Sequence, residues 1–169
     1  MDNEFNTNGF RIIRNIIDVS DWYKKAKTQE SIGQYDNQSP NSPSVYNGLN
    51  ELQEIIKPII EEKTELDLYT TYNYFRIYKN GAILSPHTDR DACEISVSLN
   101  LGGGDWDIGI FDYNNIPHTT LLKAGDALIY HGCDLVHWRP SKFKGDELIQ
   151  AFIHFVDKNG SRTSEKAVL

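Results

Sequence analysis

The sequence predicts a mainly β fold with supporting helices (α+β), on three observations. From residue 66 onward, apolar and polar residues alternate with a period of two, which is typical of half-buried strands. Gly, Asn and Asp clusters separate these short segments at turn positions. Before residue 66 the longest periodic segment has helical spacing instead. We expect the strands to close into a sandwich or a barrel.

Length and composition fit one globular domain spanning 1–169. The chain has 169 residues, of which 39% are hydrophobic and 11% aromatic, enough for a core of its own. We expect helical support over about 1–65, a β core over about 66–157 and a polar tail over 158–169. The formal net charge of −7 argues against a nucleic-acid partner, which needs a basic surface. Neither composition nor any motif indicates an oligomeric state.

Two cysteines, Cys93 and Cys133, do not make a disulfide framework, and free thiols are expected. Residues 1–8 are polar, so no secretory signal is visible. No apolar run approaches the roughly 18 residues that span a bilayer. These features predict a cytoplasmic protein without a membrane segment.

The first third of the chain predicts a strand over 10–17 and a short helix over 21–27 with Ser20 as its N-cap. Residues 28–47 are rich in Ser, Asn, Gln, Gly and Pro and predict a long loop. Loops of this length are either mobile connectors or functional lids, and both interpretations stay open. An amphipathic helix is predicted over 49–63, where Pro58 introduces a kink or a second start.

The remaining two thirds predict strands with turns between them. Gly102–Gly104 predicts a flexible link, and residues 112–115 (Asp-Tyr-Asn-Asn) predict a hairpin turn. The segment 93–101 alternates cleanly, and its polar face suits a barrel lined with ligand-binding groups. The predicted strands cover 66–78, 93–101, 106–112, 118–122, 127–130, 136–139 and 148–156.

Three residues in this β region predict a metal site. His87 and Asp89 stand at i and i+2, which fits the end of one strand, where their side chains would point to the same side. His137 lies at the start of another predicted strand and is the preferred third ligand. Two imidazoles and one carboxylate on one face of a metal leave three positions open, as in the non-haem Fe(II) oxygenases. His131 is the second candidate for the third position or a partner that orients a ligand. His118 and His154 are expected at the surface or in a pocket wall.

The same region resembles the core of the Fe(II)/2-oxoglutarate dioxygenases, especially small prolyl-4-hydroxylase-like members. The resemblance runs over about 66–157. It rests on Tyr78, Gly81, the Pro-His-Thr-Asp of 86–89, the Lys-Ala-Gly-Asp-Ala-Leu-Ile-Tyr of 123–130 and the Leu-Val-His of 135–137. It implies a double-stranded β-helix, or jelly-roll, core. It also implies Fe(II) on His87, Asp89 and His137, with 2-oxoglutarate and O₂ as cosubstrates and ascorbate as a supporting reductant.

The resemblance implies a hydroxylase that decarboxylates 2-oxoglutarate to succinate. The presence of Asp89 favours hydroxylation over halogenation, because halogenases of this superfamily lack the carboxylate. A peptidyl-proline or other side chain, or a small metabolite, are the candidate substrates. A metal-binding jelly-roll module or sensor without turnover is the alternative, and a cupin-type enzyme is a third hypothesis.

The cosubstrate's far carboxylate needs a cation, since a buried carboxylate is costly unless it is paired. Relatives usually carry Arg or Lys on the strand after the distal His, but residues 148–152 contain neither. Arg139 is preferred because it stands at i+2 from His137 and its fork suits a carboxylate. Arg76, two residues before Tyr78, is the next choice, and Lys144 the third. Tyr78 and Ser98 are expected to contact the cosubstrate, and Arg90, beside the metal pair, to bind substrate or to pair with Asp91.

Overall fold

The computed structural model describes residues 3–167, and in it strands dominate after residue 66. Three α-helices and short 3₁₀ turns accompany nine strands in this part of the chain. The helices are α1 (Glu4–Asn8), α2 (Ser20–Thr28) and α3 (Asn50–Thr64), and the 3₁₀ turns are η1 (Glu30–Ile32), η2 (Asp91–Cys93) and η3 (Thr163–Glu165). The strands are β1 (Phe10–Ile13), β2 (Ser44–Tyr46), β3 (Leu68–Lys79), β4 (Ile95–Gly103), β5 (Ile108–Phe111), β6 (Pro117–Thr120), β7 (Ala127–His131), β8 (His137–Trp138) and β9 (Glu147–Asp157).

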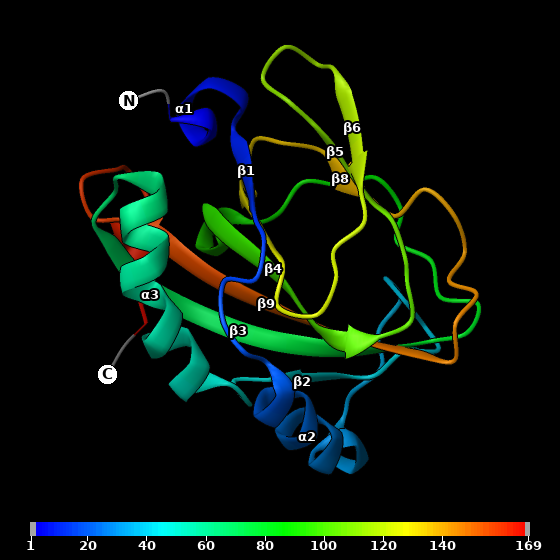
Figure 1. The fold of residues 1–169 in the computed structure, drawn as a ribbon. Helices are drawn as coiled ribbons and strands as arrows, with labels where there is room; N and C mark the ends of the chain where they lie inside the picture. Colours follow the sequence, from blue (N-terminus) through cyan, green and yellow to red (C-terminus); the bar gives the residue numbers. More distant parts are fainter. Residues whose placement is uncertain (1–2, 168–169) are drawn as a thin grey trace.

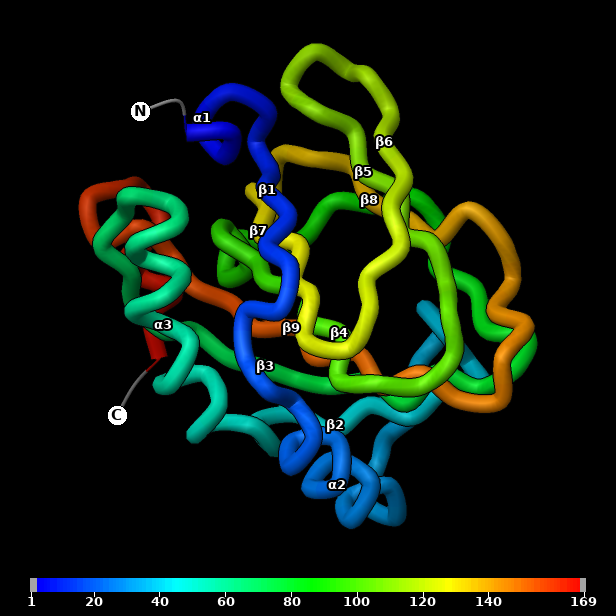
Figure 2. The backbone as a smooth tube through the Cα atoms, viewed as in Figure 1, coloured from blue at the N-terminus to red at the C-terminus, as the bar shows by residue number. Residues whose placement is uncertain are grey.

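The strands form two antiparallel sheets, which make the jelly roll that the sequence predicted. The larger sheet has the order β1-β7-β4-β9-β3-β2, and the smaller one β6-β5-β8. In Figure 1, α2 and α3 lie on the outer side of the large sheet, and the small sheet lies on the other side. The tube in Figure 2 shows how β1 from the N-terminus runs beside β7, far along the chain. The space between the two sheets is where inward side chains meet.

Helix α3 packs on the outer face of the large sheet as a brace, as its apolar spacing predicted. Leu52, Ile56 and Ile60 are fully buried in one cluster with Phe75 and Ile77 of β3. Fully burying side chains of this size stabilises a fold by about 1.5–3 kcal/mol each. The expected break at Pro58 is absent, and the helix continues through it. Pro58 faces solvent, so water can satisfy the carbonyl that loses its partner.

Several local features differ from the predictions or were not predicted individually, because tertiary contacts decide them. The polar N-terminal segment contains helix α1, capped by Asn3 and anchored by the fully buried Phe5. The predicted loop over 28–47 contains η1 and β2, and β2 exists because it pairs with β3. Ser20 begins α2 rather than capping it, and Gly102 lies within strand β4 rather than in a flexible link.

Strand β4 carries the polar inner face that the alternation predicted. Ser96, Ser98 and Asn100 are all buried, while Val97 and Leu99 face the outer core under the helices. The predicted hairpin turn at 112–115 joins β5 to β6 and is closed by Asn115 N–H donating to Asp112 O at 3.0 Å. Cys93 and Cys133 are free thiols. Among the helices of residues 3–167, each is too short or too polar to cross a bilayer.

Candidate metal centre

The backbone places His87 directly beside His137. His87 and Asp89 lie in the loop between β3 and η2 rather than at a strand end, which corrects the expected setting of the pair. His87 and His137 form an isolated antiparallel bridge, with N···O distances of 3.1 and 3.0 Å in the two directions. The N–H of Asp89 donates to Gly132 O at 2.8 Å. Two segments 50 residues apart in sequence therefore hold the three side chains in one place.

The three candidate ligand atoms converge within 4.8 Å of one another. Asp89 Oδ1 lies 3.3 Å from His137 Nε2 and 3.5 Å from His87 Nε2. His137 is buried, and the other two side chains are partly exposed. This arrangement has two imidazole nitrogens and one carboxylate oxygen on one side of a common point, which is the donor set of a facial triad.

The hydrogen bonds of the imidazole rings show that the point where the three ligand atoms converge suits a cation. His87 Nδ1 lies 2.8 Å from Ser85 O, and His137 Nδ1 lies 2.8 Å from Leu135 O. A carbonyl oxygen can only accept, so both protons sit on Nδ1 and both Nε2 atoms present lone pairs. Three acceptor atoms at this spacing repel one another unless a cation lies between them. The residues present thus fit a divalent metal, and the two carbonyls fix the ring orientations.

The charges of the site favour metal binding at neutral pH. Burial lowers the pKa of His87, and the neighbouring His137 lowers it further, so the ring stays neutral. Burial by itself would raise the pKa of Asp89, but in the metal-free chain a hydrogen bond with His137 outweighs it and holds the pKa below its usual range. A metal ion would take the place of the proton between these two groups. A neutral imidazole and an ionised carboxylate are the protonation states that coordinate metals.

The backbone of Gly132 lies close against the carboxylate of Asp89. Nothing in the sequence around Gly132-Cys133 predicted this contact. A Cβ atom on Gly132 would clash with the backbone carbonyl oxygen of Cys93, and it would lie 2.6 Å from Asp89 Oδ2 and 2.7 Å from Ser96 Oγ, all far inside van der Waals contact. Ser96 Oγ lies 3.4 Å from Asp89 Oδ2, close enough to steady the carboxylate. The absence of a side chain at position 132 therefore lets the backbone approach the carboxylate.

The other histidines lie in different surroundings. His131, the second candidate for the third position, stacks on Phe5 with ring centroids 4.4 Å apart and takes no part in the triad. His118 pairs with Asp112 at 2.9 Å at the hairpin. His154 lines the cavity beside the triad and is buried. It forms a second group of candidate ligands with Asp89 and Cys93.

The cavity around the triad is small and closed. It offers about 10 Å³, room for about one water molecule. Aromatic rings make most of its wall, and Gln38 from the segment between η1 and β2 covers it, with Nε2 3.5 Å from His87 Nε2. The lining residues are Gln38, Tyr74, Tyr78, Leu84, His87, Asp89, Ile108, Tyr130, His137, Arg139, Phe152 and His154.

Arg139 enters this cavity as a buried cation without an acidic partner. It is 6% exposed, and within residues 3–167 its guanidinium contacts only neutral acceptors: Nη1 donates to Trp106 O, and Nη2 to Gln150 Oε1 at 3.3 Å. Nε has no partner among the described residues. Burial lowers the pKa of Arg139 to about 10. An unpaired buried charge is costly, so this guanidinium is suited to an anion entering the cavity.

Arg76 is paired, which separates it from Arg139. It is 1% exposed and binds Asp36 through both guanidinium branches, at 2.7 and 3.2 Å. Carbonyls of the same loop, Ser39 O and Ser42 O, accept from Nη1. Sequence reasoning found Arg76 but not Asp36, because a loop carboxylate 40 residues away gives no local signal. Arg76 thus fastens the segment that carries Gln38.

The remaining predicted residues divide between cavity and surface. Tyr78 lines the cavity, and its ring centroid lies 5.9 Å from the Arg139 guanidinium carbon. Ser98 accepts a hydrogen bond from Gln150 Nε2 at 2.9 Å, so it supports the group that holds Arg139. Arg90 does not pair with Asp91, which binds Arg162 instead at 3.1 Å. Lys144 is exposed and lies outside the cavity lining.

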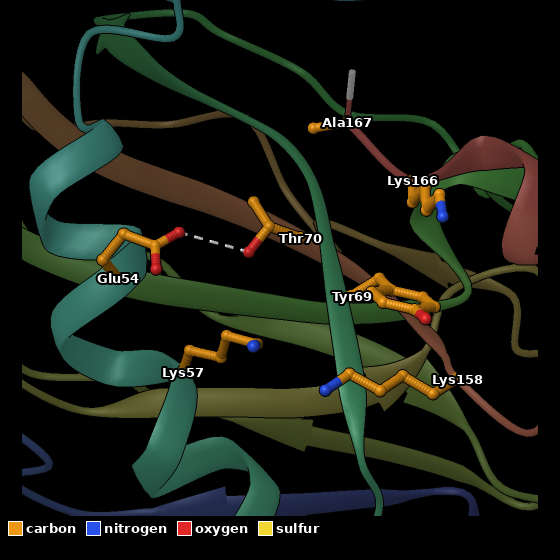
Figure 3. Close-up of a pocket in the computed structure, with 7 residues that line it drawn as sticks. All are labelled: Glu54, Lys57, Tyr69, Thr70, Lys158, Lys166 and Ala167. Atoms are coloured by element: carbon orange, nitrogen blue, oxygen red, sulfur yellow. Dashed lines mark hydrogen bonds between the residues drawn. The ribbon is translucent and has the colours of Figure 1, made fainter. Parts of the chain in front are cut away.

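A larger hollow of about 600 Å³ lies elsewhere, between α3, the start of β3 and the C-terminal segment. Figure 3 shows Lys57, Lys158 and Lys166 around Tyr69, with Glu54 bound to Thr70. Its residues include no member of the triad or of the cavity beside it. The chemistry suggested by the sequence therefore belongs to the small cavity between the sheets.

Comparison with solved structures finds the same fold in iron- and 2-oxoglutarate-dependent enzymes. A prolyl-4-hydroxylase from Pseudomonas putida has a TM-score of 0.72 at 14% identity, covering 89% of this chain and 95% of that one. The α-ketoglutarate-dependent epimerase SnoN of nogalamycin biosynthesis has a TM-score of 0.76 at 12% identity, covering 90% and 78%. HygX from Streptomyces hygroscopicus, with nickel, 2-oxoglutarate and hygromycin B bound, has a TM-score of 0.73 at 10% identity, covering 94% and 86%.

These matches confirm the predicted fold and extend it over almost the whole chain, beyond the expected 66–157. No protein-family model matches the sequence, and no curated protein matches it either. At these identities the likeness establishes the jelly-roll fold of the 2-oxoglutarate oxygenases.

Proposed function

We propose that this protein is an Fe(II)- and 2-oxoglutarate-dependent oxygenase that hydroxylates a small-molecule or peptide substrate. The observation that carries the proposal is the convergence of His87, Asp89 and His137 within 4.8 Å, with both Nε2 lone pairs turned to one point. Arg139, a buried cation without an acid partner in the described chain, adds a place for an anionic cosubstrate. The fold shared with known oxygenases agrees with both features.

Each residue has a definite task in this proposal. His87, Asp89 and His137 would hold the iron, and the carbonyls of Ser85 and Leu135 keep the rings oriented. When bound, iron would supply the oxidising chemistry by which O₂, 2-oxoglutarate and a substrate C–H bond give a hydroxyl group, succinate and CO₂.

The arginine and the cavity wall take the other tasks. Arg139 would receive the far carboxylate of 2-oxoglutarate by charge-assisted hydrogen bonds. Tyr74, Tyr130 and Phe152 surround the triad with rings and exclude water, which strengthens every electrostatic contact inside.

The second candidate function is a metal-binding jelly-roll module without turnover, favoured by the lack of a basic residue on β9. The contact between Arg139 and Gln150 weakens this argument. Arg139, which directly follows β8, places a guanidinium beside β9 in place of the missing basic residue. A cupin-type centre would draw on more histidines than the two that converge here.

The deciding experiment measures binding and turnover on the same sample. Under anaerobic conditions we expect one Fe(II) per chain and one 2-oxoglutarate per iron, seen as a metal-dependent visible absorption band. On admission of air, succinate should form slowly without substrate. Metal binding without any 2-oxoglutarate binding or succinate would instead establish the non-catalytic module. The variant His137→Ala should abolish metal binding, while His131→Gln should preserve it.

A further inference from the structure

An aromatic wall leads from the metal cavity to the protein surface. Tyr74, which lines the cavity, stacks on Phe152 at 4.7 Å and on Tyr46 at 5.1 Å. Tyr46 comes from the edge strand β2, lies across from Tyr74 in register and is 47% exposed. Tyr72 joins the same stack, with centroids 6.2 Å from Tyr46 and 6.3 Å from Tyr74. Of these three rings only that of Tyr46 is exposed, while Tyr72 and Tyr74 are partly buried; the exposed ring offers a flat, partly apolar contact to a ring-shaped molecule.

Arg90 stands at the outer end of this wall. Its guanidinium carbon lies 4.8 Å from the centroid of Tyr72, and its Nε donates to the Tyr72 hydroxyl at 3.3 Å. It has no carboxylate partner in residues 3–167, since Asp91 is taken by Arg162. Three other arginines, Arg14, Arg76 and Arg162, all pair with acids. The guanidinium of Arg90 is therefore oriented by Tyr72 and has no carboxylate partner in the described chain. It lies one residue after the candidate ligand Asp89.

His154 stands at the inner end of the wall. Its ring lies 4.7 Å from that of Tyr72, and it is 2% exposed. Its Nδ1 contacts Ser96 Oγ at 2.9 Å, while Nε2 is buried without a partner in the described chain. A buried, unsatisfied ring nitrogen beside the triad is suited to a hydrogen bond with an incoming molecule.

We propose that the substrate is a ring-bearing organic acid: its flat part packs on the exposed ring of Tyr46, its anionic group pairs with Arg90, and a polar group near the reacting carbon bonds to His154. This inference rests on the proposed function, because it orients the molecule toward the iron. It assigns different anions to two of the three arginines that lack an acidic partner in the described chain, with Arg139 for the cosubstrate and Arg90 for the substrate. The third, Arg11, donates to the backbone carbonyl of Lys63 at 3.2 Å. The acid group then lies at the mouth, and the ring or chain beyond it extends toward the triad.

The test uses the full chain loaded with Ni(II) and saturating 2-oxoglutarate, so that Arg139 is occupied and no turnover occurs. The probes are ω-phenylalkanoates with two to five methylene groups, together with the matched carboxamides and amines, titrated by calorimetry. We expect at least one acid to bind about tenfold more tightly than its amide, without displacing 2-oxoglutarate. Arg90→Gln should remove this preference, and Tyr46→Leu should weaken acid and amide alike by about threefold or more.

Controls separate the inference from the proposed function. Arg162→Gln removes a nearby arginine that is already paired, and it should leave the preference for acids unchanged. Equal binding of acids and amides to the wild type, a preference that survives in Arg90→Gln, or acids that compete with 2-oxoglutarate would each overturn the substrate class. Failure to load Ni(II) or 2-oxoglutarate at all would overturn the proposed function instead.

Discussion

The guanidinium of Arg139 lies against the side-chain amide of Gln150, with Nη2 3.3 Å from Oε1. Gln150 belongs to β9, the strand on which related oxygenases were expected to carry a basic residue. Here the strand supplies an amide, and the cation arrives from the segment after β8. Gln150 in turn donates to Ser98 on β4, so three elements fix the arginine. Arg139 therefore gives the cavity a buried positive charge, although β9, the strand expected to carry it, has no Arg or Lys.

The first prediction separates the two arginines. Arg139→Gln should weaken 2-oxoglutarate binding by about 30-fold or more, because truncating a buried charge partner costs about 2–5 kcal/mol. Arg76→Gln should leave the affinity within about threefold, since its guanidinium is already bound to Asp36. Anaerobic titration of the Fe(II)-loaded variants gives both numbers. The reverse order of effects would assign the cosubstrate to Arg76.

The second prediction concerns the backbone behind Asp89. Gly132→Ala should lower Ni(II) affinity by at least tenfold, because the new Cβ would push the carboxylate from its position. All three candidate ligands remain in this variant, so the loss would come from geometry alone. Gly160→Ala is the matched control, as its nearest neighbours lie 3.3 Å or more from the added carbon. Unchanged affinity in Gly132→Ala would show that the carboxylate tolerates displacement.

The third prediction concerns the segment 33–43, which covers the triad through Gln38. With room for about one water, the cavity must open before 2-oxoglutarate can enter. Asp36→Asn weakens the attachment to Arg76, and it should speed amide hydrogen exchange in this segment and accelerate cosubstrate association. The loss of stability should be about 1–2 kcal/mol, since the partly exposed carboxylate is screened. Asp105→Asn, which removes an exposed ion pair with Lys123, should change neither rate.

The fourth prediction follows from the burial of His154. Burial lowers its pKa from the ordinary 6.5 to about 4. The unfolded chain therefore binds this proton at a higher pH than the folded one. The stability that the neutral ring contributes is fully present above pH 6.5 and is lost as the pH falls toward 4, by up to about 3 kcal/mol.

Comparison with His154→Gln measures that contribution together with its coupling to the neighbouring carboxylate of Asp89. Urea unfolding of the metal-free chains between pH 7 and 4 should give free energies whose difference shrinks as the pH falls. A constant difference across this range would show that folding leaves the pKa of this ring unchanged.

Patterns that depend on one strand or one turn could be predicted from the sequence. The alternation in β4 and the spacing of His87 and Asp89 are local features, and each places side chains on a known side of the backbone. Arg139 was also reached in this way, by its distance of two residues from His137. Its role toward a cosubstrate stays a prediction.

Features that depend on distant partners could not be predicted. Strand β2 is three residues long and exists through pairing with β3. Whether Arg76 is free or paired depends on Asp36, and the place of His154 beside the triad depends on how β9 lies against β4. A polar loop sequence is compatible with many conformations, so its contacts over the cavity are determined by the folded sheet beneath it.

The last prediction moves the buried charge from one strand to another. In an Arg139→Met background, Gln150→Lys places an ammonium group where the amide of Gln150 now meets the guanidinium. The new lysine can still donate to Ser98 Oγ, as Gln150 does at 2.9 Å. We expect the double variant to recover at least tenfold of the 2-oxoglutarate affinity that Arg139→Met loses. Gln150→Lys alone should destabilise the protein, because it sets two cations together in a buried site. Recovery would show that the cavity needs a charge at this place and not a particular residue, whereas no recovery would mean that the planar fork of Arg139 is required.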